Sequence, residues 1–457
     1  MDLMFIIRSD LVKKYIKYIK YVFVFIASII FLNFIPFDLD EIWNYGFMHS
    51  IYNGLIPYKD FNMVITPFFP FLFSIPFYIF GSNLLVVNVC QALLITLVYF
   101  VLEKLFGKNA NILLIILFFN YDMLYASYNF FIFFLFLLLL LMEKKNVNDY
   151  LIGIVIGLSV LTKQSIGGCL ALVSLYYLFK DYKKFFKRVA GAMIPTIIFI
   201  LYIFINNCYK EFFDLCIMGM FDFGKENYIG NIYVLILFFV CLGLIIYSIV
   251  KDKKNINNYY ILAFSSIAIP MFDFFHFKFF LMGLLFIVIG KLSIKKINLD
   301  LLMYGCLGGL VIINMISSID GSFTYPNDIK HFQFRYISNE HIKETKEVSN
   351  ALLKYKDKNV ILLFEQSYYY KILNDIPINY IDLINTGNWG FDGSKKLYNK
   401  LEENKESVFV INRYSYVGTN QSDKTALNYV LDNGTKIDEI YNFEFYIIEG
   451  ENTNKSS

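Results

Sequence analysis

Two adjacent acids, Asp40 and Glu41, follow the first long apolar segment of the chain, in the stretch FDLDEIWNYGFMHSIYNGLIPYKDF (residues 37–61). A polar residue at the edge of a membrane costs free energy, so it needs either a partner or a function. A carboxylate at such an edge can take a proton from an attacking hydroxyl group. Asp40 and Glu41 are therefore the candidate catalytic residues. The alternative is that they are solvated acids at a helix end.

Further polar residues interrupt or flank apolar segments and are candidates for binding substrate. A cation among them could hold an anionic group, although a lysine at a membrane edge can also extend its amine to water. An Asp and a His three residues apart could act together, or could form a satisfied pair that caps a turn. These candidates are Lys163 and Gln164 in LTKQSIGG, Asp273 and His276 in FDFFHFK, Asn129 at the end of NYDMLYASYN, and Lys59.

Two other residues raise questions of cofactor and substrate contact. His49 has no second His or Cys at ligand spacing, so no metal ion or other cofactor is predicted, although a divalent metal stays open. Trp389 is the aromatic residue on a polar loop of the C-terminal segment, which makes it a candidate contact to substrate. The other aromatic residues are expected to face lipid or the protein core.

The composition is that of a polytopic α-helical membrane protein. Of its 457 residues, 57% are hydrophobic and only 17% are charged, which is unusual for a soluble domain. The Lys and Arg residues are scattered between apolar runs and are not gathered on one face, so nucleic acid is not an expected partner. The expected partners include membrane lipids, and the expected location is a bacterial plasma membrane.

Twelve apolar segments occur before residue 318, and a span needs roughly 20 residues. Clusters of Lys and Arg mark cytoplasmic loops, which places the N-terminus inside. Four segments lie between the first outer loop and Lys144, where an odd number must cross. One of the four is therefore re-entrant or interfacial, or two form one bent helix. The prediction is about 11 crossings, with the C-terminus outside. The inside clusters are Lys13 to Lys20, Lys144 with Lys145, Lys180 to Arg188, Lys251 to Lys254 and Lys291 to Lys296.

The chain divides into two predicted domains. Residues 1–317 form the transmembrane domain, with residues 37–66 as its first outer loop, in which an amphipathic surface helix is followed by a turn and a proline-led return to the membrane. Residues 318–457 form a small extracytoplasmic α/β domain. Its predicted strands are 359–364, 378–384, 407–412 and 443–449, and its predicted helices are 341–356, 394–405 and 425–434.

The first outer loop carries a resemblance to a known family. The pattern DE, then NGLIPYKDF, then TPFFPFL resembles the first outer loop of the polytopic glycosyltransferases of the GT-C class, which include protein mannosyltransferases and aminoarabinose transferases. GLSVLTKQSIGG is similar to a helix end of bacterial members, FDFFHF to an Asp-x-x-His turn, and NTGNWGFDG to a loop of Gram-positive relatives. The resemblance covers most of the chain, and its specific part is the first loop.

The resemblance implies a function and assigns roles to the candidate residues. The donor would be a sugar on a polyprenyl phosphate, and the acceptor a cell-envelope glycan, lipid or protein on the outer face. Asp40 would be the general base, and Lys163 the cation at the lipid phosphate, with Lys59 and Lys278 behind it. The second membrane acid that is usual in the class has no certain equivalent here, because the chain offers Asn129 or Asp122.

Several departures from the family and several other functions stay open. Relatives of the aminoarabinose type carry an Arg where this chain has Trp43, and a basic residue where it has ITP, so phosphate binding would differ.

The runner-up enzyme is a lipid-linked glycan polymerase or ligase, which would usually need paired arginines outside. A flippase or transporter would be expected to show related halves with broken helices. A catalytically silent scaffold that presents the C-terminal domain is the last alternative.

Overall fold

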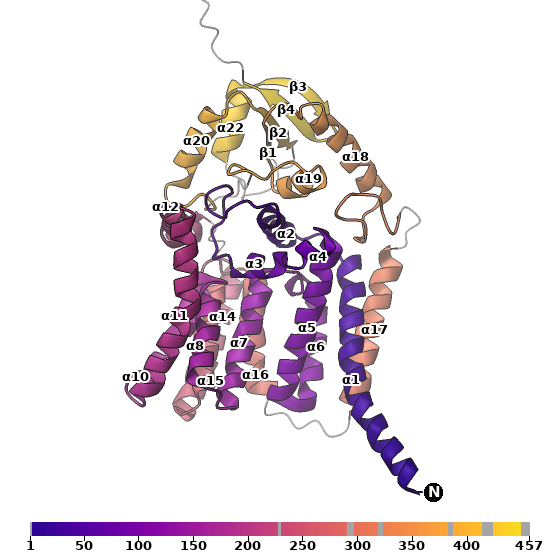
Figure 1. Cartoon of the computed structure of the whole chain (residues 1–457), viewed down its shortest axis with the longest axis vertical. Coiled ribbons are helices and arrows are strands. Elements are labelled where there is room, and N and C mark those ends of the chain that lie inside the picture. The colour runs from indigo at the N-terminus through magenta and orange to yellow at the C-terminus, as the bar shows by residue number, and fades with distance from the viewer. Residues whose placement is uncertain are drawn as a thin grey trace, which may run out of the picture.

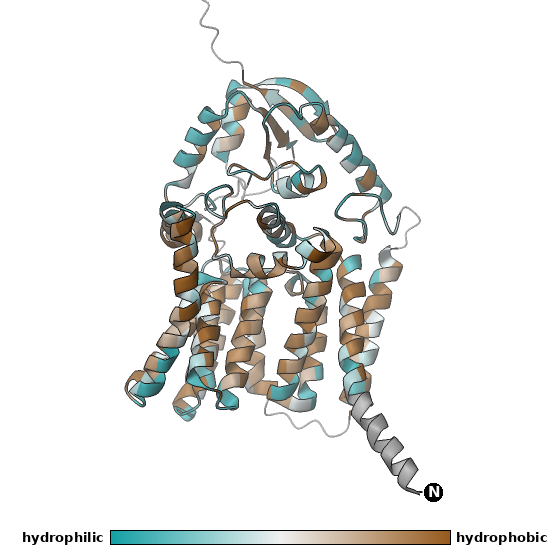
Figure 2. Cartoon of the chain, in the orientation of Figure 1, coloured by the Kyte–Doolittle hydropathy of each residue, from teal (hydrophilic) through white to brown (hydrophobic). Residues whose placement is uncertain are grey.

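The computed structural model describes residues 2–226, 230–289, 297–318, 323–382, 387–413 and 424–448. Long helices run side by side in a bundle, and the described residues from 323 to 448, here called the C-terminal region, cover one end of it (Figure 1). We call this end the cap end and the opposite end the basic end. Hydrophobic residues dominate the middle of the bundle, while hydrophilic residues gather at the basic end and over the C-terminal region (Figure 2).

The first two helices make a sharp bend at the cap end. Helix α1 spans Asp2–Phe34 and α2 spans Leu39–Tyr52, and their axes differ by 102°. The carboxylate of Asp38 accepts a hydrogen bond of 2.9 Å from the backbone nitrogen of Asp40, which caps the start of α2. The predicted surface helix therefore exists. It is buried on most sides, because the C-terminal region covers the face that would otherwise meet water.

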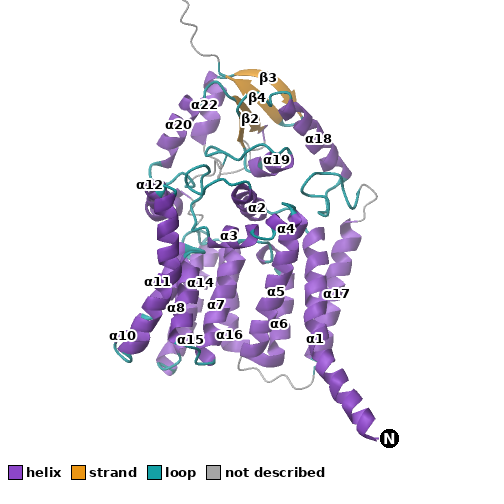
Figure 3. Ribbon diagram, in the orientation of Figure 1, coloured by secondary structure: helices purple, strands orange, loops and turns teal. Residues whose placement is uncertain are grey.

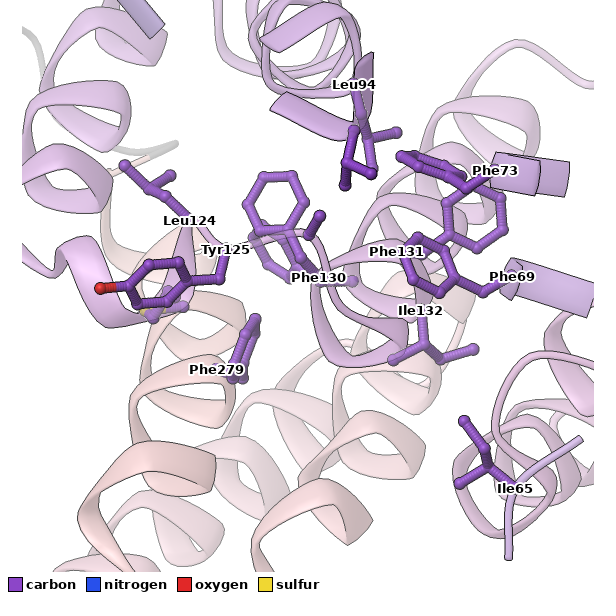
Figure 4. Close-up of a cluster of buried hydrophobic side chains, with 14 of the residues drawn as sticks. Ile65, Phe69, Phe73, Leu94, Leu124, Tyr125, Phe130, Phe131, Ile132 and Phe279 are labelled. Atoms are coloured by element: carbon purple, nitrogen blue, oxygen red, sulfur yellow. The ribbon is translucent and has the colours of Figure 1, made fainter. Parts of the chain in front are cut away.

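The apolar segment that follows the first outer loop lies along the cap end and does not cross the bundle. It consists of α3 (Phe68–Ser74) and α4 (Phe77–Phe80), which are far shorter than a span and are separated at Pro76. Phe69 and Phe73 of α3 pack on Phe131 of α7, with ring centroids 5.6 and 6.2 Å from that ring (Figure 4). These two helices are too short to cross a membrane, and the way in which the four apolar segments are arranged in a membrane stays a prediction.

The remaining helices of the bundle differ in length. Helices α5 (Leu84–Phe106) and α6 (Ala110–Phe119) lie side by side and are joined by η1 (Gly107–Asn109), where Gly107 has φ +60°. The others are η2 (Tyr121–Met123), α7 (Tyr128–Lys144), α8 (Asp149–Val160), α9 (Gln164–Leu172), α10 (Leu175–Leu178), α11 (Tyr182–Ile205), α12 (Tyr209–Phe212), the π-helical η3 (Phe213–Met218), α13 (Gly219–Glu226), α14 (Ile232–Lys251), α15 (Ile256–Phe264), η4 (Ser265–Ala268), α16 (Phe274–Ile289) and α17 (Leu299–Ser318).

The number of crossings is a separate question from the number of helices. Among the described residues, four helical runs are long and apolar enough to cross a membrane, or up to five if α1 and α2 count as one bent span. Shorter apolar helices, such as α8 and α16, lie among them in the bundle. The prediction of about 11 crossings with the N-terminus inside stays a prediction.

Most of the basic clusters that predict the cytoplasmic side meet at the basic end. Lys20 pairs with Glu103 near the end of α5, and the amine of Lys144 donates to the carbonyl oxygen of Leu105 at 2.6 Å. Arg188 pairs with Glu143 at 2.5 Å and with Asp149 at 2.8 Å, which ties α11 to α7 and α8. The cluster from Lys291 to Lys296 lies outside the described residues.

The C-terminal region contains a four-stranded sheet flanked by helices. The strand order is β1-β2-β4-β3, with β1 and β2 parallel and the other pairs antiparallel. The strands are β1 (Val360–Leu363), β2 (Val408–Asn412), β3 (Thr435–Ile440) and β4 (Phe443–Ile447). The helices are α18 (Asn339–Leu353), α19 (Ser367–Leu373), α20 (Gly393–Glu403) and α22 (Lys424–Asn433). The predicted α/β character is confirmed, and the boundary at residue 318 stays a prediction.

One predicted strand is wrong and another was missed. The described part of segment 378–384 forms a turn, because the side chains of Asn379 and Asp382 bind nearby backbone nitrogens at 2.9 and 2.7 Å and compete with strand pairing. Residues 383 and 384 lie outside the described residues. Strand β3 is an exposed edge strand with four charged or polar residues in the sequence TKIDEI, so it lacks the apolar alternation that predicts a strand.

The C-terminal region docks directly on α2. The indole nitrogen of Trp43 donates to the carbonyl oxygen of Glu365 at 3.1 Å. The ring of Tyr368 lies so close to Gly46 that a β-carbon there would overlap it. Between the bundle and the sheet the chain consists mostly of loops, with α2 and α19 among them (Figure 3).

Candidate active site

A cavity of about 470 Å³ lies at the cap end, between the start of α2, the turn before α9 and the start of α16. One part of its wall is polar and charged, and another is apolar. Its polar lining includes Asp38, Asp40, Tyr128, Lys163, Gln164, Ser165, Asp273, His276 and Asn388, and its apolar lining includes Trp43, Phe47, Val64, Ile65, Leu215, Met220, Phe223, Pro270, Met271 and Phe275. The sequence-predicted residues Asp40, Lys163, Gln164, Asp273 and His276 therefore share one cavity.

Asp40 sits in the first turn of α2, where the capping carboxylate of Asp38 fixes the backbone. Its own carboxylate accepts a hydrogen bond from the side-chain amide of Asn129 at 3.3 Å. Burial, together with the nearby negative charge of Asp38, raises the pKa of Asp40 to about 7, although Lys163 opposes this shift. A carboxyl group with a pKa near neutrality can exchange a proton under physiological conditions.

Asn129 joins Asp40 to Lys163. The amine of Lys163 donates to the side-chain oxygen of Asn129 at 2.7 Å and lies 5.1 Å from the ring centroid of Tyr128. Burial lowers the pKa of Lys163 to about 8, although the carboxylates of Asp40 and Asp273 oppose the shift. Asn129 is thus the residue that binds Asp40, while Asp122 forms an ion pair with Lys278.

Asp273 and His276 form a second polar pair in the wall. One carboxylate oxygen of Asp273 accepts from the backbone nitrogen of His276 at 2.7 Å and caps α16. The other lies 2.8 Å from the Nδ1 atom of the same histidine. This contact orients the imidazole and leaves its Nε2 atom as the ring nitrogen that Asp273 does not engage. The pair therefore caps the start of α16 and also lines the cavity, and its contact with substrate stays a prediction.

Gln164 supports the wall. Its amide nitrogen donates to the carbonyl oxygens of Val64 and Cys216, at 2.8 and 3.0 Å, and its oxygen accepts from the backbone nitrogen of Thr66 at 3.3 Å. These bonds tie the start of α9 to the first outer loop and to η3. Because the amide is used in these three bonds, Gln164 positions the loop more than it offers hydrogen bonds to a ligand.

Glu41 is not among the residues that line the cavity, and its catalytic role stays a prediction. Its carboxylate is fully buried and binds the guanidinium group of Arg335 at 2.7 and 3.2 Å. Arg335 also donates to the carbonyl oxygens of Leu32 and of Pro36, the latter at 2.7 Å. Glu41 is thus paired across the interface between the first outer loop and the C-terminal region.

Asn129, Lys59 and Trp389 are also absent from the cavity lining, although Asn129 binds two residues that line it. Lys59 is exposed on the turn that follows α2. Trp389 is only 2% exposed and packs in the hydrophobic core of the C-terminal region, because the turn that carries it points inward. The structure places the neighbouring Asn388 at the cavity instead.

Several lining residues were not foreseen from the sequence. Tyr128 lies next to Asn129 in the sequence, and this position is the signal that could have identified it. Met220 and Phe223 come from α13, a short amphipathic helix with no distinctive motif. Among the described residues, no group of three His, Cys, Asp or Glu side chains comes together as metal ligands would.

The comparisons with known proteins concern the fold. No family model and no curated protein sequence matches the chain. Two crystal structures of ArnT from Cupriavidus metallidurans are similar, one bound to undecaprenyl phosphate and one in the apo state. Their TM-scores are 0.55 and 0.54, with 10% and 11% identity, over 93% of this chain and 97% of ArnT. ArnT is an aminoarabinose transferase of the GT-C class, and the chain therefore has a GT-C-like fold, as the resemblance of its first loop predicts.

Proposed function

We propose that this chain is a membrane glycosyltransferase that moves a sugar from a polyprenyl-phosphate donor to an acceptor in the cell envelope. The observation that carries the proposal is the joining of Asp40 and Lys163 through Asn129 in one cavity. Glycosyl transfer from a lipid phosphate requires a base and a cation close together, and this arrangement supplies both. The similar structure of ArnT with bound undecaprenyl phosphate supports a donor of this kind.

In the proposed step, a hydroxyl oxygen of the acceptor attacks the anomeric carbon of the donor sugar. The bond from that carbon to the phosphate oxygen breaks, and its electron pair leaves with the lipid phosphate. Asp40 accepts the hydroxyl proton. Lys163 stabilises the negative charge that returns to the phosphate. The carboxylates of Asp38 and Asp273, which also line the cavity, stabilise the positive charge that develops on the sugar ring.

The other candidate residues take supporting roles in this proposal. His276, oriented by Asp273, and Asn129 contact the substrate or hold the groups that do. Glu41 is a positioning residue, because its pairing with Arg335 fixes the first turn of α2. Lys59 and Trp389 are left out of the proposed site because they do not line the cavity. The site would face the side of the membrane away from the basic end, and no metal ion is assigned to it.

The experiment compares wild-type protein with Asp40→Asn in membranes supplied with radiolabelled undecaprenyl-phosphate sugars. Transfer is expected to fall about 100-fold or more in Asp40→Asn, the lower range for loss of a general base. Asp357→Asn, which changes an exposed acid in the C-terminal region, is the control and should match wild type. Unchanged transfer in Asp40→Asn would remove the catalytic assignment. Absence of transfer from every such donor by the wild type would contradict the function itself.

A further inference from the structure

One wall of the cavity comes from the C-terminal region. Asn388 lines the cavity together with residues of α2, α9 and α16, although it lies near the other end of the sequence. Its side chain is only 4% exposed. A buried polar side chain in a cavity wall is expected to make hydrogen bonds, either within the protein or to what the cavity binds.

The turn that carries Asn388 is held in place by contacts within the C-terminal region. The next residue, Trp389, is 2% exposed in the core of that region, with its ring edge-on to Tyr380 at 5.4 Å between centroids. Gly387 and Gly390 flank these two residues with φ of +81° and +76°, which side chains rarely adopt. The tight turn therefore places one of two adjacent residues in the core and the other at the cavity wall.

The same turn is also held in place by contacts with residues of the bundle. Gly390 lies against Asp214 and Gly219, so that a β-carbon on Gly390 would come within 2.6 Å of an Asp214 carboxylate oxygen. The Asp214 carboxylate pairs with Lys396 of α20. The backbone nitrogen of Asp392 donates to the Asp222 carboxylate at 2.9 Å. Contacts on both sides hold the position of residue 388 before any ligand enters.

We infer that Asn388 contacts the sugar of the donor and helps to determine which sugar the enzyme accepts. A carboxamide can donate and accept hydrogen bonds without a charge, which suits the hydroxyl groups of a sugar. The charged residues that the proposed function assigns to proton transfer and phosphate binding come from the bundle side. Among the described residues that line the cavity, Asn388 is the one that the C-terminal region contributes, and its neutral carboxamide suits the sugar group that differs between donors. This inference rests on the proposed function.

The kinetic test uses Asn388→Ala and Asn388→Asp in the full-length protein, with a panel of radiolabelled undecaprenyl-phosphate sugars. Asn388→Ala is expected to raise KM for the preferred sugar by roughly threefold to tenfold, the effect of losing one neutral hydrogen bond, and to change the ranking of the sugars. Asn399→Ala, which alters an exposed residue of α20, should keep the wild-type values. If wild type transfers sugar and Asn388→Ala keeps the same KM and ranking, the inference is wrong while the proposed function stands.

A binding test does not depend on transfer or on the folding of one variant. Asn388→Cys in membranes is treated with a membrane-impermeant maleimide, and the wild type, with its six native cysteines, gives the background. Undecaprenyl-phosphate sugars are expected to protect Cys at 388, whereas undecaprenyl phosphate without a sugar should protect it less. Equal modification with and without the sugar-bearing lipids would overturn the inference, even if no transfer is observed.

Discussion

Asn129 has an unusual position among the charged residues of the cavity. Its amide nitrogen binds the Asp40 carboxylate and its oxygen binds the Lys163 amine, at 3.3 and 2.7 Å. One neutral side chain therefore orients both a carboxylate and a cation and keeps them from pairing directly with each other. A hydrogen bond donated to a carboxylate stabilises its charged form.

The pH dependence of transfer tests this arrangement. The kcat/KM for the donor is expected to rise through about pH 7, since Asp40 must be ionised to accept a proton, and to fall above about pH 8 as Lys163 loses its charge. In Asn129→Ala, the carboxylate loses a donor, so the rising limb should move to higher pH. The measurement is the pH profile of kcat/KM for wild type, for Asn129→Ala and for the control Asn399→Ala. A rising limb at the same pH in Asn129→Ala would contradict the assigned role.

At the scale of elements, the bend between α1 and α2 depends on a buried ion pair from a distant segment. Arg335 binds Glu41 and also the carbonyl oxygens of Leu32 and Pro36, which the end of α1 leaves without helical partners. Both side chains of the pair are fully buried. Removal of one partner would leave a buried charge without compensation.

Arg335→Ala is expected to lower the free energy of unfolding by about 3 to 5 kcal/mol. The double variant Glu41→Leu with Arg335→Met should recover a large part of that loss, because it removes both charges. Lys346→Ala is the control, since Lys346 and its partner Asp328 are 49% and 66% exposed and such surface pairs contribute about 0 to 1 kcal/mol. Unfolding in detergent measures all three. Equal losses for Arg335→Ala and Lys346→Ala would contradict the structural role.

The elements also show which features local sequence can predict. Asp40, Lys163, Asp273 and His276 interrupt apolar runs, and a polar residue in such a place is visible without any partner. The partner of Glu41 is 294 residues away, and Asn388 reaches the cavity through a turn, so neither contact has a local pattern. The prediction of a strand at 378–384 is wrong although a local pattern of apolar alternation is present. The side chains of Asn379 and Asp382 bind nearby backbone nitrogens there and favour a turn.

At the scale of the whole molecule, the bundle and the C-terminal region meet over α2. The ring of Tyr368 occupies the space that a side chain at position 46 would need, and Phe47 packs edge-on against the same ring with centroids 5.8 Å apart. The helix that carries Asp40 is therefore held from both sides. Displacement of the C-terminal region should also disturb the cavity.

Gly46→Ala tests this coupling. The added β-carbon would overlap the Tyr368 ring, and overpacking of this kind costs roughly 1 to 3 kcal/mol. Limited proteolysis should release the C-terminal region faster than in wild type, with transfer reduced in parallel. Gly243→Ala in α14, where a β-carbon meets no other atom within 4 Å, is the control. Addition of Tyr368→Ala to Gly46→Ala should remove most of the difference, and failure of both effects would contradict the coupling.

The contribution of Asn388 to the cavity has a consequence for the timing of protein synthesis. Asp38 and Asp40 leave the ribosome early, whereas Asn388 follows only after every helix of the bundle. A nascent chain whose helices are already inserted would still have an open cavity at one wall. The cavity would be completed only when the C-terminal region has folded onto α2, so a chain interrupted before that stage would lack this wall of the proposed site.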